Sequence, residues 1–110
     1  MNDESAAALL GALANPTRLG ILRHLVKAGA DGAPAGEIAG VVNSSPSRAS
    51  FHLAAMTDLH VLTAERNARQ IIYRIDFDVL GGLLNFIIED CCAGNPTMRA
   101  CCETTSTTCA

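Results

Sequence analysis

The chain has 110 residues and a net charge of −3, which is the size of one domain and small enough to gain from pairing with a second copy. It contains no run of eighteen apolar residues, so we expect no membrane-spanning segment. The acidic start, from Met1 to Glu4, differs from the positively charged start of a secretory signal, so we expect a cytoplasmic protein.

The charge is unevenly distributed along the chain. Residues 16–74 carry seven basic and four acidic side chains, a balance of +3, whereas the two flanks carry one basic and seven acidic side chains, a balance of −6. A basic centre with acidic ends is compatible with DNA held by the middle of the chain.

Apolar residues at helical spacing predict four helices, at about residues 4–14, 16–29, 34–42 and 46–59. Asn15-Pro16 and Ser45-Pro46 each place a capping side chain before a proline, which is a typical helix start. In the third helix we expect the apolar residues to face inward, namely Ile38, Val41 and Val42. The apolar positions of the fourth include Phe51, Leu53 and Met56.

After residue 61 the pattern changes from helical to alternating. Residues 62–65 and 70–75 are predicted strands around a polar turn at 66–69, with Arg66 and Arg69 at its tip. Helical spacing returns at Phe77. Gly81 and Gly82 each cost this last helix about 1 kcal/mol relative to alanine, so we expect another backbone to approach there closely.

Two short helices joined by a tight turn, followed by a basic hairpin, predict a mainly α winged helix-turn-helix. The segment from Leu13 to Leu22, Leu-Ala-Asn-Pro-Thr-Arg-Leu-Gly-Ile-Leu, resembles a signature of the ArsR/SmtB family of dimeric bacterial metal-sensing repressors. The segment from Ser45 to Leu53 is similar to the recognition helix of that family. The resemblance extends from about Leu9 to Cys92 and implies a homodimer that binds double-stranded operator DNA.

The chain departs from the family pattern in two places. Leu59-His60 stands where the family often has Ala-Gly, so we expect His60 to adopt a left-handed backbone conformation. The third helix, Glu37 to Val42, lacks the Cys-x-Cys that arsenic and cadmium sensors of the family carry there. The cysteines near the C-terminus instead resemble an alternative arrangement found in some arsenic sensors.

The resemblance implies a DNA-binding surface on the recognition helix and the wing, formed by Ser45, Ser47, Arg48, Ser50, His52, Arg66 and Arg69. Arg48 is the candidate to read guanine, because its guanidinium matches the O6 and N7 acceptors. Arg66 and Arg69 are expected to contact phosphate, and the minor groove is the alternative. For His52, contact with DNA and packing inside the protein both remain open.

Apolar residues of the first and last helices have two interpretations. Both apply to Leu9, Leu13, Leu80, Leu84 and Ile88. In the simpler interpretation these residues form part of the hydrophobic core. In the functional interpretation they form a dimer interface.

All five cysteines fall in the last twenty residues, at Cys91, Cys92, Cys101, Cys102 and Cys109. A structural disulfide framework would be spread through the fold, whereas gathered reduced thiols suit a soft ion such as arsenite, antimonite, cadmium or zinc. We predict an inducer site for As(III), with Sb(III) as the nearest alternative, formed by Cys91, Cys92 and either Cys101 or Cys102. The chain would then divide into a DNA-binding and dimerisation domain, 1–92, and an inducer-binding tail, 93–110.

Other functions remain open on the residues alone. The thiols also suit a sensor of methylarsenite or cadmium, a redox-sensing repressor, or a metal-buffering module. We expect no enzyme, because Asp76 and Asp78 lack a placed histidine and no glycine-rich phosphate loop follows a strand.

Overall fold

A computed structural model describes the backbone of residues 1–94 and the side chains of residues 1–88. The elements of this part are α1 (Asp3–Leu13), α2 (Pro16–Ala28), a 3-10 turn (Gly29–Asp31), β1 (Ala33–Pro34), α3 (Ala35–Val41), α4 (Pro46–Asp58), β2 (Leu62–Asn67), β3 (Gln70–Ile75) and α5 (Phe77–Gly94). This order confirms the predicted winged helix-turn-helix. No helix among the described residues is long and apolar enough to span a membrane.

The predicted helix starts are confirmed by their capping bonds. The Asn15 side chain accepts hydrogen bonds from the backbone N–H groups of Thr17 and Arg18, at 2.8 and 3.1 Å. The Ser45 hydroxyl accepts one from the backbone N–H of Arg48 at 3.3 Å. These bonds satisfy donors that have no partner inside the helix, and so fix where α2 and α4 begin.

A short strand, β1, completes a three-stranded antiparallel sheet in the order β1-β3-β2. Helical spacing predicts a third helix that begins at Pro34, whereas Pro34 ends β1 and α3 begins at Ala35. The hairpin register pairs Asn67 with Gln70, so its turn is Ala68-Arg69 rather than the predicted four residues. Gly32 is required beside β1, because its φ is +64° and a Cβ there would lie 2.5 Å from the Tyr73 carbonyl oxygen.

One apolar core joins the helices to the sheet, and its largest fully buried side chains are Ile21, Leu25, Ile38, Leu53, Met56, Val61, Leu62 and Leu83. The expectation that Val41 faces inward is wrong. Val41 is 52% exposed, because the buried stripe of the short helix α3 runs through Ile38 and Ala39. Phe51 is 66% exposed, because the buried stripe of α4 is Ala49, His52, Leu53 and Met56.

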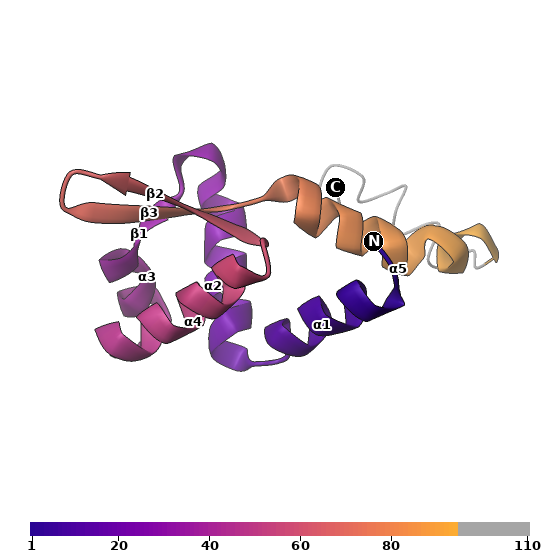
Figure 1. Cartoon of the computed structure of the whole chain (residues 1–110), viewed down its shortest axis with the longest axis horizontal. Coiled ribbons are helices and arrows are strands. Elements are labelled where there is room, and N and C mark those ends of the chain that lie inside the picture. The colour runs from indigo at the N-terminus through magenta and orange to yellow at the C-terminus, as the bar shows by residue number, and fades with distance from the viewer. Residues whose placement is uncertain (95–110) are drawn as a thin grey trace.

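The helices and strands are arranged along one long axis (Figure 1). The wing and the pair α3–α4 lie at one end, while α1 and α5 extend towards the other. The turn between α4 and β2 contains His60 with φ 66°, as predicted. The proposed domain boundary at residue 92 falls inside α5, which continues to Gly94. The predicted tail from residue 95 onward lies outside the described residues.

Candidate nucleic-acid interface

The outward face of α4 is polar at its N-terminal end. Ser47, Arg48 and Ser50 are all exposed, as expected for side chains that reach a partner. Ser45 is also exposed, although its hydroxyl is engaged in capping the Arg48 N–H. Phe51 lies on the same exposed side, since it follows Ser47 by four residues and Arg48 by three.

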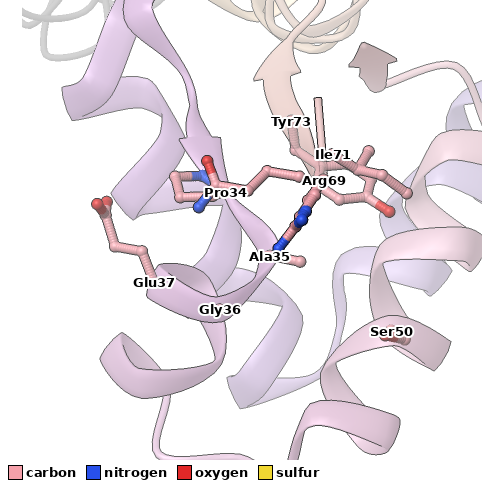
Figure 2. A pocket seen from close by; sticks show the side chains of 9 residues that line it. Pro34, Ala35, Gly36, Glu37, Ser50, Arg69, Ile71 and Tyr73 are labelled. Carbon is pink, nitrogen blue, oxygen red and sulfur yellow. The ribbon is translucent and has the colours of Figure 1, made fainter. Parts of the chain in front are cut away.

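The wing places two further arginines in solvent. Arg66 lies near the end of β2 and Arg69 in the turn, and both are exposed. An open cavity of about 310 Å³ separates the wing from the helix-turn-helix, with Arg69 and Ser50 among its lining residues. Figure 2 shows the Arg69 guanidinium beside Ala35, at the start of α3, while Glu37 points away from it. Arg69 and Ser50 therefore lie on one continuous surface, which joins the wing to α4.

Arg74, the remaining arginine of the wing, supports its base. It donates one hydrogen bond to the Ala30 carbonyl and another to the Glu65 carboxylate, each at 2.8 Å. The ion pair with Glu65 crosses between β3 and β2, and the bond to Ala30 anchors β3 to the turn before β1. Arg74 thus positions the hairpin, whereas Arg66 and Arg69 are exposed to solvent.

His52 faces inward, in contrast to the serines and Arg48. Only 9% of the residue is exposed, and its Nδ1 accepts a hydrogen bond of 2.9 Å from the Arg18 Nε–H. Arg18 also donates to the Ala12 carbonyl at 3.3 Å, so one guanidinium connects α1, α2 and α4. This geometry favours packing over DNA contact for His52. Arg18 was not among the predicted site residues, because its partner is 34 positions away and no local pattern marks the pair.

The Arg18 contact determines the protonation state of His52. An arginine side chain can only donate, so Nδ1 must be unprotonated to accept the bond. Burial of the ring, together with the positive charges of Arg18 and Arg48, lowers the pKa of His52 below its ordinary value of 6.5. The imidazole is therefore neutral at physiological pH.

This depressed pKa makes His52 a source of acid sensitivity. Well above pH 6.5 the ring is neutral in the folded and unfolded chains, and its contribution to stability is fully present. As the pH falls below that value, the unfolded chain binds the proton first, so the free energy of unfolding decreases. We expect His52→Asn, whose amide oxygen can still accept from Arg18, to reduce this pH dependence. Urea unfolding of the wild type and of this variant, between neutral pH and about pH 5.5, measures how the free energy of unfolding changes with pH. The same change in both proteins would contradict the assignment to His52.

The residues predicted for a dimer interface divide into two groups. Leu9 and Leu80 are 3% and 9% exposed and belong to the core of this chain, and Leu13 packs against that core. Leu84 is 43% exposed on α5, and Ile88 is half-buried. The exposed group therefore lies along α5, while Leu9 and Leu80 belong to one core to which α1 and α5 both contribute.

The cysteines fall outside the described side chains. The backbone at Cys91 and Cys92 belongs to the last part of α5, and Cys101, Cys102 and Cys109 lie beyond it. Within the described part of the chain, no group of three or more His, Cys, Asp or Glu residues is placed to hold a metal ion. The inducer site thus stays a prediction from the sequence.

A helix-turn-helix with a polar and basic outward face, followed by a hairpin with two exposed arginines, defines a winged-helix DNA-binding protein. Residues 13–64 match the family model described as a helix-turn-helix domain. The chain is 38% identical over 81 residues to the HTH-type transcriptional regulator YgaV of Escherichia coli K12, a match that covers 74% of this chain and 80% of YgaV.

Solved structures agree with this classification. The antimony-specific transcriptional repressor AntR is 32% identical, with a TM-score of 0.60 over 81% of this chain and 80% of AntR. The ArsR family transcriptional regulator RHA00566 has a TM-score of 0.69 over 82% of this chain and 90% of its own, and its 19% identity makes this a likeness of fold. The chain belongs to the ArsR/SmtB family of winged helix-turn-helix transcriptional regulators.

Proposed function

We propose that this protein is an arsenite-responsive repressor, which binds operator DNA as a homodimer and is released when As(III) binds cysteine thiolates near its C-terminus. The observation that carries the proposal is the gathering of all five cysteines in the last twenty residues of a transcriptional regulator. Thiolates are the ligands that soft ions prefer. The likeness to AntR, an antimony-specific repressor, adds support, because trivalent antimony and arsenic share this preference.

The DNA-binding part of the proposal is supported by the surface that joins α4 to the wing. Arg48 on α4 and Arg66 and Arg69 on the wing present three exposed cations on these two elements. In a winged helix the recognition helix enters the major groove and meets the base edges. We therefore expect Arg48 to contact base edges and the wing arginines to contact phosphates.

Separate roles for Arg48 and Arg69 lead to different mutant behaviour. We expect Arg48→Ala to weaken operator binding by about 1–3 kcal/mol and to relax the preference at one base pair. Arg69→Ala should weaken binding to all sequences alike and lower the salt slope by about one, as for a lost phosphate contact. Fluorescence anisotropy with operator variants at several salt concentrations measures both effects. Identical behaviour of the two variants would contradict the separation.

The homodimer is supported by an exposed apolar stripe on α5. Phe77, Leu84 and Ile87 are 49%, 43% and 39% exposed, although each is large and apolar. Gly81 lies on the same side of the helix as Phe77 and Leu84, and a Cβ built on it would meet nothing within 4 Å inside the chain. A second copy packed against this stripe would bury the apolar side chains and supply the close backbone approach predicted for Gly81.

The same helix links the stripe to the cysteines. Leu84 lies in the middle of α5, and Cys91 and Cys92 follow on its last part. An ion held by these thiols would therefore act at the end of the proposed dimer interface. The ion-bound dimer would then favour a spacing of its two recognition helices that does not fit successive major grooves. Its affinity for the operator would fall as a result. Coupling between such sites is typically about 1–3 kcal/mol, which corresponds to a roughly 5- to 150-fold change in affinity.

The direct test is release of the full-length protein from the DNA immediately upstream of its own gene. We expect arsenite to raise the dissociation constant of that complex, measured by anisotropy under reducing conditions. Parallel titrations with antimonite, methylarsenite and cadmium identify the preferred ion. Release by peroxide, without any response to arsenite, would indicate a redox sensor and overturn the proposal. Unchanged DNA binding in the presence of every agent would leave the thiols as a metal buffer, and would overturn it too.

A further inference from the structure

We propose that Phe51 is a specificity-determining residue of the recognition helix, and that it reads thymine by contact with the 5-methyl group. The inference rests on the proposed entry of α4 into the major groove. Phe51 is 66% exposed, the largest exposed fraction among the large apolar residues of the described chain. The ring stands in solvent on the side of α4 opposite to its buried stripe, which is the side proposed to face the groove.

The surroundings of Phe51 indicate the chemistry of that partner. The ring shares the exposed side of α4 with Ser47, Arg48 and Ser50, so an apolar group stands among hydroxyls and a cation. Ala54, one turn further along, is also exposed and is small enough to allow close approach. The thymine methyl is the one apolar feature that a base pair presents in the major groove, and phenylalanine is among the residues that contact it.

The ring is held in place before DNA arrives. The Arg18 guanidinium lies over it, 5.9 Å from the ring centroid, and the His52 ring meets it edge-on at 5.7 Å and 69°. Arg18 is itself fixed by hydrogen bonds to His52 and to the Ala12 carbonyl. Because Phe51 has only two rotatable side-chain bonds and two braced neighbours, little conformational freedom remains to be lost on binding.

The reading of a single methyl group can be tested by atom-level changes in the DNA. Deoxyuridine replaces thymidine without altering any hydrogen bond, so it removes only the methyl. We would select duplexes from random sequence with the full-length wild-type protein, and then substitute each thymidine in turn. At one thymine of each half-site we expect the substitution to weaken wild-type binding about fourfold, the value of one buried methyl-sized group.

Two protein variants test whether the side chain of Phe51 contacts this thymine methyl group. Phe51→Ala should bind the thymine and uracil duplexes with equal affinity. That affinity should be no higher than the affinity of the wild type for the uracil duplex. Phe51→Leu keeps an apolar side chain and should retain part of the discrimination. Both should unfold at nearly the wild-type urea concentration, because the ring is mostly exposed.

Each outcome bears on the proposal. Wild-type binding that is specific but insensitive to every uracil substitution would overturn the reading role and leave the DNA-binding function standing. A methyl effect of equal size in wild type and Phe51→Ala would assign the reading to another residue. A wild-type protein that selects no duplex at all would overturn both the reading role and the proposed function.

Discussion

Replacement of Cys91 or Cys92 by serine is expected to abolish the arsenite response and to leave DNA binding intact. Both residues lie on α5, whose helical backbone continues to Gly94, so they are attached to the element that carries the proposed dimer interface. Loss of either removes one of the two thiolates that are attached to this helix. Each thiolate of the proposed site comes from the same chain at high effective concentration, so the loss of one should raise the arsenite needed for release by roughly 100-fold or more.

The remaining cysteines serve as internal controls for this prediction. Cys101 and Cys102 are adjacent, so we expect each single serine variant to keep a partial response and the double variant to lose it. Cys109→Ser should be silent, since two neighbours already offer the third thiolate. X-ray absorption should show three sulfur ligands around arsenic and no nitrogen. A Cys101→Ser/Cys102→Ser protein that leaves DNA at the wild-type arsenite concentration would rule out the site in this form.

How much of the fold can be predicted depends on how local each signal is. The starts of α2 and α4 are predictable because Asn15 and Ser45 cap their own helices within three residues. The left-handed residue His60 is predictable because the family pattern marks that turn. Strand β1 is not predictable, because two residues are too few to show a periodic pattern and because Ala33 pairs with Tyr73, which is distant in the sequence.

The site follows the same division between local and distant causes. Exposure of Ser47, Arg48 and Ser50 follows from their place on α4. The inward position of His52 can be predicted from the sequence, because His52 has helical spacing with Ala49, Leu53 and Met56. Its polarity alone would favour the surface. The hydrogen bond from Arg18 to His52 cannot be predicted from the sequence, because it depends on how α2 packs against α4.

That bond also has a consequence for signalling between the two ends of the molecule. Arg18 contacts α1 through the Ala12 carbonyl and α4 through His52, and it lies over Phe51. A shift of α1 would therefore act on the recognition helix through one side chain. Ala6 and Leu9 of α1 belong to the same core cluster as Leu80 and Leu83 of α5, so we expect a change at the proposed dimer interface to reach the recognition helix through this core.

Leu84→Glu is expected to produce monomers that bind operator DNA poorly. Leu84 is 43% exposed in the single chain, so the glutamate is tolerated there, whereas in the dimer it would bury an unpaired carboxylate. Only 43% of the leucine is exposed in the single chain, so loss of its contact at the interface costs about 1 kcal/mol. The change occurs twice in a two-fold dimer, so the lost contacts alone should weaken dimerisation by about 2 kcal/mol, or roughly 30-fold, and the two buried carboxylates should weaken it further. A monomer then binds one half-site without the effective concentration that the second half-site provides.

The neighbouring residue supplies a matched control for that variant. Asn85→Glu adds the same charge one position further along, on the polar side of α5 and at an exposed residue. It should therefore keep both the dimer and the operator affinity. Sedimentation equilibrium at micromolar concentration and anisotropy with the operator measure the two quantities. A Leu84→Glu protein that remains dimeric under these conditions would place the interface elsewhere. Monomers that bind the operator as tightly as wild type would show that the second copy adds nothing to DNA recognition.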